Sequence, residues 1–290
     1  MKAGWIGLGA MGWPMAGHLH RNQHLDRVWN RSRDKAEAFA EQHPDVALAT
    51  DPVDLAAAVD VVMICVSADQ DLDHVVEAMK PALRAGQIVV DHSTVSPQTA
   101  RKLGRDLAEM EVAFIDAPVT GGVEGAVKGQ LAIMAGGEWA SFHRLAPLID
   151  SYARIHHHLG PNGSGQAAKA VNQLMVAGIA EAVCESLALM DRLDLPREAM
   201  LELLGGGAAA NWFLDKRGRT MLADEFDTGF DPRLLLKDLK ICQSLCQDTG
   251  FESAVIEQAL ADYARLVKSD DHGRDISALI RLKRKEPETG

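Results

Sequence analysis

Cysteine is scarce in this chain, and positive charge is not in excess. The 290 residues include four cysteines, scattered through apolar segments, which predicts reduced thiols in a cytoplasmic protein instead of a disulfide framework. Cys242 and Cys246 are four positions apart, but no histidine lies close to them in the sequence, so we expect no metal site. The formal net charge of −11 argues against a nucleic-acid-binding surface.

Long uninterrupted hydrophobic runs are also missing from the start of the chain. Residues 3–16 are apolar, but glycines and a proline interrupt them, which argues against a signal peptide. We expect no run long enough to span a bilayer, and hence no membrane partner. Hydrophobic residues make up 47% of the chain and charged residues 24%, which is typical of a soluble protein with one large domain or two.

A glycine-rich segment follows the first predicted strand, residues 2–7. Gly7-Leu8-Gly9-Ala10-Met11-Gly12 matches the pattern G-x-G-x-x-G at the start of a helical pattern. Gly7 permits a tight turn, Gly9 lets the backbone approach a pyrophosphate, and Gly12 lets helix and strand pack closely. The helix N-terminus offers unpaired N–H groups to the phosphates. This context predicts a dinucleotide-binding site.

The end of the second predicted strand, residues 26–29, indicates which dinucleotide binds. An NAD site usually has an acidic residue there, on the ribose 2′-hydroxyl, but this chain has Asn30, Arg31 and Ser32. A guanidinium and a hydroxyl bind a 2′-phosphate that a carboxylate would repel. We therefore expect NADP(H) in preference to NAD(H); the alternative is that Arg31 is an ordinary surface arginine.

Strands and helices continue to alternate through the first half of the chain. Apolar runs at residues 60–66 and 87–91 predict buried strands, and residues 113–115 and 131–135 supply later ones. Repeated βα units predict a doubly wound, mostly parallel sheet with helices on both faces. Ligands bind beyond the carboxyl ends of such strands. Further residues that we expect at this edge are Val66, Ser67, Asp71, Ser93 and Thr94.

A second glycine-rich turn, Thr120-Gly121-Gly122, closes the segment 116–122. Successive backbone N–H groups in such a turn suit a carboxylate; the alternative is a plain glycine loop.

Three adjacent histidines, His156-His157-His158, form another motif. Adjacent residues of a strand point to opposite faces, so these imidazoles are not expected to share a metal, and we predict a solvated or edge strand.

One long helix is predicted from Gly163 to about Leu193, because this apolar run contains no proline. At about 1.5 Å per residue its length is on the order of 45 Å, enough to link two domains. Lys169 and Asn172 lie on one face of it. Lys169 is either a catalytic candidate or a lysine whose stem packs while its head reaches water.

The pattern from Pro196 to Leu282 is helical and contains no convincing strand. We therefore expect a cofactor-binding domain at residues 1–161, followed at residues 162–290 by the long helix and an all-helical domain. The short basic segment 281–285 predicts a solvated end.

Together the motifs resemble the β-hydroxyacid dehydrogenase family, over nearly the whole chain. They are the segment 7–15 with its glycines, the segment 116–122 with Gly125, the segment 163–172, and Lys237-Asp238-Leu239. Within the family, the chain looks most like the 3-hydroxyisobutyrate dehydrogenases, tartronate semialdehyde reductases and glyoxylate/succinic semialdehyde reductases.

This resemblance implies both a fold and a set of roles. The fold is a Rossmann domain, an interdomain helix and a helical domain that helps to form a homodimer or homotetramer. Lys169 matches the family's catalytic lysine and Asn172 its accompanying amide, and Thr120, Gly121 and Gly122 match the substrate-carboxylate loop. Thr94 matches a residue beside the nicotinamide, and Lys237 matches a lysine that closes over cofactor and substrate. Asn172-Gln173 departs from the two asparagines of some members, which is a hint about subfamily.

We therefore expect a cytoplasmic, NADP(H)-dependent oxidoreductase that acts on CH–OH groups without a metal. It would interconvert a small β-hydroxy acid and its semialdehyde. The alternatives are a relative that acts on serine-like amino acids or imines, and an inactive cofactor-binding relative. A third alternative is a 6-phosphogluconate dehydrogenase, but we expect the C-terminal region of this chain to be too short for that enzyme.

Overall fold

The computed structural model describes residues 1–227 and 229–284. The chain divides into two compact units, Met1–Lys169 and Ala170–Gly290. The division falls inside one long helix. The domain boundary that the sequence predicts, after residue 161, falls shortly before this division and stays a prediction.

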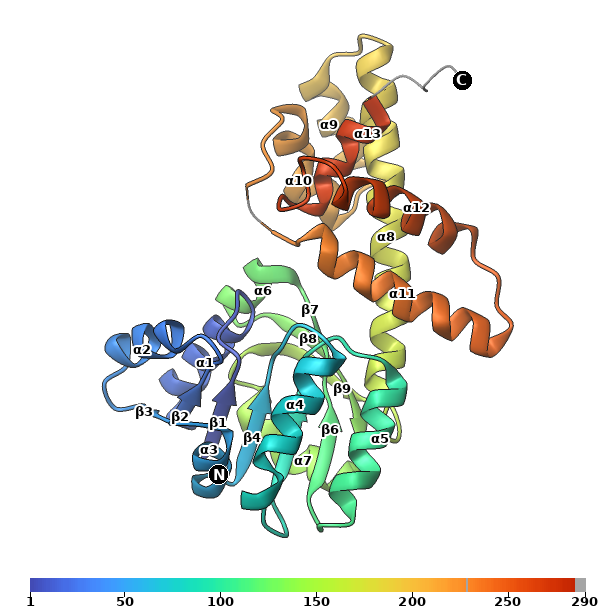
Figure 1. Cartoon of the computed structure of the whole chain (residues 1–290). Coiled ribbons are helices and arrows are strands. Elements are labelled where there is room, and N and C mark those ends of the chain that lie inside the picture. The colour runs from blue at the N-terminus through green and yellow to red at the C-terminus, as the bar shows by residue number, and fades with distance from the viewer. Residues whose placement is uncertain (228, 285–290) are drawn as a thin grey trace. The chain divides into compact units, whose positions relative to one another are not determined.

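A mostly parallel sheet forms the centre of the first unit (Figure 1). Its strands are β1 (Ala3–Ile6), β2 (Leu25–Trp29), β3 (Ala47–Leu48), β4 (Val61–Ile64), β5 (Ile88–Asp91), β6 (Ala113–Asp116), β7 (Val119–Thr120), β8 (Leu131–Gly137) and β9 (Ala153–His158). The spatial order is β3-β2-β1-β4-β5-β6-β8-β7, and β9 pairs with β8. β8 is antiparallel to β6 and β7, whereas the pairs from β3 to β6 are parallel. The chain order reverses between β1 and β4, so the predicted doubly wound fold is confirmed.

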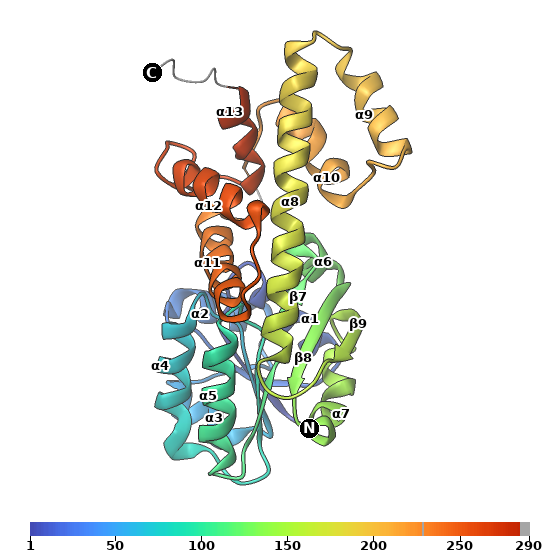
Figure 2. The ribbon, with the colours of Figure 1, turned by 90° about the vertical axis from the view of Figure 1, so that its right-hand side faces the viewer.

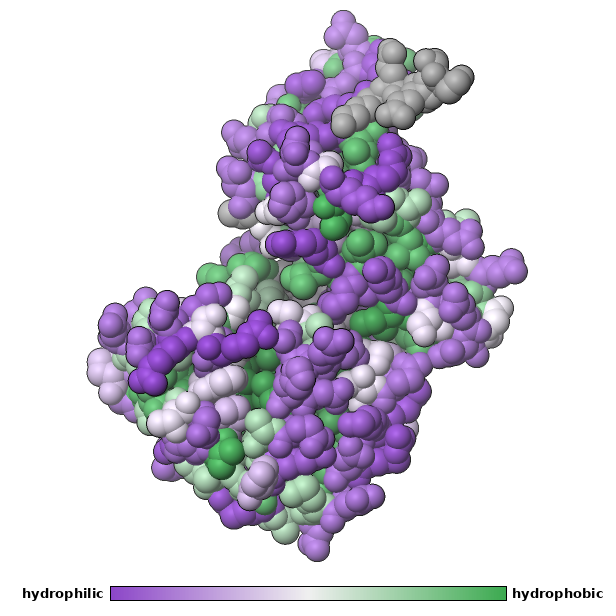
Figure 3. Space-filling model, in the orientation of Figure 1, coloured by the Kyte–Doolittle hydropathy of each residue, from purple (hydrophilic) through white to green (hydrophobic). Residues whose placement is uncertain are grey.

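Helices cover both faces of this sheet. They are α1 (Gly12–Arg21), α2 (Arg33–Gln42), α3 (Pro52–Ala58), α4 (Asp69–Met79), η1 (Lys80–Ala82), α5 (Pro97–Ala108), α6 (Gly122–Lys128) and α7 (Trp139–Ile149). Trp5 and Met63 belong to a core shared with α1, α2 and α7, whereas Ile6 and Ile64 belong to one shared with α3, α4 and α5. α4 and α5 lie in front of the strands in Figure 1, and mostly hydrophilic side chains cover them in Figure 3.

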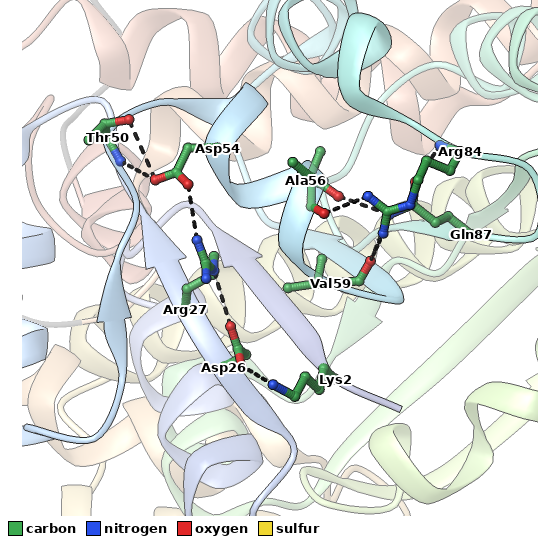
Figure 4. A network of polar contacts seen from close by, with 10 residues as sticks. Lys2, Asp26, Arg27, Thr50, Asp54, Ala56, Val59, Arg84 and Gln87 are labelled. Atoms are coloured by element: carbon green, nitrogen blue, oxygen red, sulfur yellow. Dashed lines mark hydrogen bonds and ion pairs between the residues drawn. The ribbon is translucent and has the colours of Figure 1, made fainter.

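A polar network holds the amino ends of the strands (Figure 4). Asp26 accepts hydrogen bonds from Lys2 and Arg27, each at 3.0 Å, and Arg27 also donates to Asp54 at 3.0 Å. The Gln87 amide donates to two backbone carbonyls at the end of α3, at 2.9 and 2.7 Å. This network stabilises the edge of the sheet opposite the carboxyl ends, where ligands of such folds bind.

The described part of the second unit consists of helices, as the sequence predicts. They are α8 (Ser164–Arg192), which begins in the first unit, α9 (Arg197–Gly206), α10 (Trp212–Leu222), α11 (Pro232–Thr249), α12 (Ala254–Val267), η2 (Ile276–Ala278) and α13 (Leu279–Arg284). α8 is unbroken over its 29 residues (Figure 2). Ala177, Ala180, Cys184 and Leu187 follow helical spacing and are fully buried, so one face of α8 forms the core of this unit.

α8 corrects one expectation from the sequence. We expected no apolar run long enough to span a bilayer, but by length and composition alone this helix qualifies. Half of its most apolar stretch is buried inside the protein. A core helix of a globular protein is apolar for the same physical reason as a membrane span, since both remove their side chains from water.

The basic end of the chain corrects a second expectation from the sequence. Arg281, Lys283 and Arg284 were expected in a solvated tail, and Lys285 lies outside the described residues. Lys283 instead is only 12% exposed and pairs with Glu181 at 2.5 Å and with Asp262 at 2.6 Å. The carboxylates of α8 and α12 hold α13 in place, which the sequence pattern of the tail alone does not indicate.

Candidate active site

The glycine loop after β1 has the geometry that its sequence predicts. Gly7 has φ +98°, and a Cβ there would lie 2.1 Å from the carbonyl oxygen of Cys65. A Cβ on Gly12 would lie 1.9 Å from the carbonyl oxygen of Gly7. Glycine is therefore required at both positions. A Cβ on Gly9 would meet no atom within 4 Å, so the protein leaves space above the loop at this point. Such a loop at the N-terminus of α1 fits a dinucleotide pyrophosphate.

Asn30 holds this loop against the end of β2. Its Oδ1 accepts a hydrogen bond from the Leu8 N–H at 2.8 Å, and its Nδ2 donates to the carbonyl oxygen of Ser32 at 2.9 Å. The sequence marked Asn30 only as a cofactor contact. The structure adds a role, because its amide fixes the position of the backbone that would face the phosphates.

Arg31 lies at the surface beside Asp71. Its side chain is 81% exposed, and its Nη1 is 2.7 Å from Asp71 Oδ1. The structure thus brings two of the expected cofactor residues together. An exposed pair contributes only about 0–1 kcal/mol, so the guanidinium can exchange the carboxylate for a phosphate at little cost. Ser32, just before α2, is exposed as well.

Ser93 connects the ends of β4 and β5. Its Oγ accepts a hydrogen bond from the Val66 N–H at 2.8 Å, and its own N–H donates to Asp91 Oδ1 at 2.9 Å. Ser93 is 2% exposed, whereas Val66 and Thr94 are half-buried and Ser67 is exposed. The residues expected at this edge therefore do gather at neighbouring strand ends, but the Ser93 hydroxyl is engaged with the backbone.

Sequence reasoning missed the buried polar residues that carry the start of α8. Asp116, at the end of β6, accepts hydrogen bonds from the N–H groups of Gly163 at 2.8 Å and Gln166 at 3.0 Å. The Gln166 amide donates to the Ser93 carbonyl at 2.8 Å. Burial raises the pKa of Asp116. A carboxyl at a strand end and a Gly-Ser-Gly helix start were the only sequence signals.

Lys169 is thereby placed one turn after this anchored helix start. It is 7% exposed, the last residue of the first unit. An ammonium group is rarely so buried unless it has a specific partner or function.

Two glycines with positive φ form the turn after β7. Gly121 has φ +131° and Gly122 has φ +66°, conformations that side-chain-bearing residues rarely adopt. Both glycines are exposed and lead directly into α6, and Thr120 is half-buried. The backbone N–H groups at the start of a helix favour a carboxylate.

In the second unit, Asn172 and Lys237 are the ends of one polar chain. Asn172 Nδ2 donates to Gln173 Oε1 at 2.9 Å, and Gln173 Nε2 donates to Asp238 Oδ2 at 2.7 Å. Lys237 Nζ lies 2.9 Å from Asp238 Oδ1. Gln173 is 2% exposed and Asp238 4%. The sequence marked the two ends, on α8 and α11, as site residues, whereas the buried pair that joins them was named only as part of the motifs.

The three adjacent histidines lie on β9, which pairs only with β8 in the described sheet. The prediction of an edge strand is confirmed. His156 Nε2 is 2.9 Å from Asp150, and His158 Nε2 is 2.7 Å from the carbonyl oxygen of Gly137. His156 and His158 thus have different partners.

Comparisons with known proteins agree with this architecture. Residues 2–160 match the model for the NAD binding domain of 6-phosphogluconate dehydrogenase, and residues 163–283 match that for the NAD-binding of NADP-dependent 3-hydroxyisobutyrate dehydrogenase. An uncharacterised oxidoreductase of Shewanella frigidimarina is 36% identical over 282 residues, 96% of this chain and 97% of the relative. The 2-hydroxy-3-oxopropionate reductase of Escherichia coli is 33% identical, over 83% of this chain and 82% of that enzyme.

Among solved structures, the 3-hydroxyisobutyrate dehydrogenase of Mycobacterium tuberculosis with L-serine superimposes with a TM-score of 0.87. It is 27% identical, over 98% of this chain and 99% of that chain.

Proposed function

Since the chain belongs to the β-hydroxyacid dehydrogenase family, and is an oxidoreductase that uses a nicotinamide cofactor, we propose that it is an NADP(H)-dependent semialdehyde reductase. The reaction interconverts a small carboxylate-bearing aldehyde and its β-hydroxy acid. The observation that carries the proposal is Lys169, a buried lysine one turn after a helix start that is anchored to the carboxyl ends of β5 and β6.

The catalytic roles follow from the chemistry of each group. When bound, the cofactor supplies or accepts the hydride. Lys169 Nζ hydrogen-bonds the carbonyl oxygen of the aldehyde and gives it a proton as the hydroxyl forms; in the reverse direction, it takes that proton back. The ammonium also stabilises the negative charge that develops on this oxygen. Asn172 orients the reacting oxygen or the lysine.

The substrate carboxylate is assigned to the turn after β7. The N–H groups of Gly121 and Gly122 and the Thr120 hydroxyl donate to it, and Lys237 and Ser93 are further proposed contacts. Positioning the carboxylate at a fixed distance from the aldehyde carbon orients that carbon for hydride transfer.

NADP(H) is favoured over NAD(H) because the end of β2 presents Arg31 and Ser32 to the ribose. Arg31 pairs with Asp71 at 2.7 Å at the exposed surface, and in the proposal the guanidinium exchanges this carboxylate for the 2′-phosphate. The remaining proposed cofactor contacts are Gly7, Leu8, Gly9, Ala10, Met11, Gly12, Asn30, Val66, Ser67, Asp71, Thr94 and Lys237.

A second candidate is oxidation of L-serine or a similar β-hydroxy amino acid. The solved structure with L-serine favours it, because that ligand has the same hydroxyl-to-carboxylate spacing as a β-hydroxy acid. Initial rates with glyoxylate, succinic semialdehyde, tartronate semialdehyde, methylmalonate semialdehyde, L-serine and a cyclic imine, each with both cofactors, separate the candidates.

The decisive variant is Lys169→Ala. Its kcat should fall by about 10²–10⁴-fold, the usual contribution of a general acid–base group, while the dissociation constant for NADPH stays within a few-fold of wild type. Steady-state assays measure kcat, and fluorescence titration measures the dissociation constant for NADPH. Lys240→Ala, which changes an exposed lysine of α11, is the control and should keep wild-type kcat. A Lys169→Ala enzyme that retains more than about a tenth of wild-type kcat would show that the role is wrong.

A homodimer or homotetramer and a cytoplasmic location remain part of the proposal. Apolar side chains that are more than half exposed lie along α8, which supports contact with a second copy of the chain. They are Val171, Met175 and Leu189, and Leu193 follows directly after the helix.

A further inference from the structure

Gln173 and Asp238 form a buried polar pair between two helices of the second unit. The residues are 65 positions apart, and the 2.7 Å hydrogen bond between Gln173 Nε2 and Asp238 Oδ2 joins α8 to α11. Each partner touches one residue of the proposed site: Gln173 accepts from Asn172 at 2.9 Å, and Asp238 pairs with Lys237 at 2.9 Å.

The Asp238 carboxylate fixes the direction of both hydrogen bonds that lead from it through Gln173 to Asn172. Asp238, when ionised, can only accept, so Gln173 must turn its NH₂ group toward α11 and its Oε1 toward Asn172. Oε1 can only accept in turn, so Asn172 must present Nδ2 to it. The carbonyl oxygen of the Asn172 amide is then the group left to accept a hydrogen bond from a reactant or from an ammonium group.

We propose that Gln173 is a positioning residue of the reductase, and that with Asp238 it fixes the amide orientation of Asn172 and the place of Lys237. This inference rests on the proposed function. Without Gln173, the Asn172 amide could rotate by half a turn and offer NH₂ where an oxygen is required, and Asp238 would lose one of its two partners.

Stability alone gives little reason for such a pair. Replacing buried charged groups by apolar side chains of similar size is often neutral or stabilising. The same chemistry occurs elsewhere in this unit without a link to the site: Gln258 Nε2 donates to Asp262 Oδ2 at 2.6 Å. This second pair provides a control for the loss of a Gln–Asp hydrogen bond, because the exposed Gln258 touches neither Asn172 nor Lys237.

The test compares four variants in the reduction of tartronate semialdehyde and methylmalonate semialdehyde with NADPH. Gln173→Met keeps the side-chain length but removes both hydrogen bonds, so kcat should fall by about 10–100-fold, as expected for misplacement of a catalytic group. Gln173→Glu places a second carboxylate against that of Asp238, and the repulsion between them should lower both kcat and Tm. Gln258→Met should leave kcat and KM within about twofold of wild type.

The fourth variant combines Gln173→Glu with Asp238→Asn. It restores a donor–acceptor pair in the opposite direction, and the carboxylate introduced at position 173 still accepts from Asn172. Relative to Gln173→Glu alone, kcat should recover at least tenfold and Tm should rise. KM for the aldehyde acids should stay above wild type, because Lys237 has lost its anionic partner.

Two results would overturn the inference. One is a Gln173→Met enzyme with lowered Tm but kcat and KM within twofold of wild type, which indicates a merely structural pair. The other is a double variant as slow as Gln173→Glu alone. Failure of the proposed function is distinguishable, since wild type itself would then reduce neither aldehyde while the double variant still recovered Tm.

Discussion

At the scale of single residues, the cofactor pocket depends on short side chains that serve both the fold and the ligand. Asn30 is the clearest case, because its Oδ1 accepts a hydrogen bond from the Leu8 N–H while the residues that follow it are the proposed ribose contacts. An aspartate at this position would keep an oxygen acceptor for Leu8 but would lose the Nδ2 donor to the Ser32 carbonyl oxygen, so the Tm of such a variant should be measured beside its specificity.

Cofactor preference should therefore reverse or disappear in the variant Asn30→Asp with Arg31→Ala. The change removes the guanidinium and leaves Asp71 without the partner that it has at 2.7 Å, so carboxylates rather than a cation face the 2′-phosphate. A hydrogen bond to a charged group contributes about 1.5–3 kcal/mol, roughly a ten- to hundredfold preference. The measurement is kcat/KM with NADPH and with NADH.

Wild type should have the higher kcat/KM with NADPH, and added salt should weaken NADPH binding more than NADH binding. A wild-type preference for NADH would mean that Arg31 is an ordinary surface arginine.

A second residue-scale prediction concerns Asp91, which is fully buried at the end of β5. Burial raises its pKa from an ordinary 3.8 to about 7. The folded state therefore binds the proton more tightly than the unfolded state between these values, and stability falls as pH rises through this window. Asp91→Asn keeps the acceptor for the Ser93 N–H but cannot ionise.

The Tm of Asp91→Asn minus that of wild type should therefore increase from pH 5 to pH 8, as measured by calorimetry in buffers of equal ionic strength. A difference that is flat or that decreases over this range would contradict the assigned pKa.

At the scale of secondary-structure elements, buried ion pairs attach the last helix to its unit. Lys283 of α13 lies within 2.9 Å of Glu181 and Glu185 on α8 and of Asp262 on α12. Burial raises the pKa of Glu181, while hydrogen bonds and charge from Lys283 oppose this rise. One ammonium group thus neutralises part of a carboxylate cluster between three helices.

Lys283→Met should destabilise the protein by about 3–5 kcal/mol, the usual effect of removing one partner of a buried ion pair. The remaining carboxylates would lack a counter-charge, so lowering the pH toward 5 should recover part of the loss. Urea unfolding of the variant at pH 5 and pH 7.5 tests both points. Lys268→Met, at an exposed position in the same unit, should change stability by less than about 0.5 kcal/mol.

At the scale of the whole molecule, the exposed apolar side of α8 should determine the assembly state. Met175 is 65% exposed and Leu189 is 57% exposed, on the longest helix of the chain. A lysine at both positions places charges on a surface that a second copy would have to desolvate. Multi-angle light scattering should report a dimer or tetramer for wild type and a smaller particle for Met175→Lys with Leu189→Lys.

Leu203→Lys, which changes a 69% exposed leucine on α9, is the matched control and should keep the wild-type mass. A monomeric wild type at micromolar concentration would remove the oligomer from the proposal.

What the sequence by itself determined are features that depend on residues close together in the chain. The glycine loop was identifiable because its backbone conformation and close contacts require glycine at Gly7 and Gly12, and α8 because its apolar residues recur without a helix breaker. The alternating strands and helices likewise indicated the doubly wound sheet. Lys169 and Asn172 were found on a helix face whose spacing is fixed by the helical repeat.

Only the tertiary structure decided which polar groups share a buried partner. Asp116 meets Gln166, and Gln173 meets Asp238, across 50 and 65 residues. The ion pairs of α13 also join residues far apart in the sequence, since Lys283 is 98 residues from Glu185 and 21 residues from Asp262. For this reason its basic end was expected in solvent. A periodic pattern shows which face of an element is buried but not what it is buried against. Hydrogen-bond partners across such distances follow from strand order and helix packing, and the residues themselves carry no local signal for either.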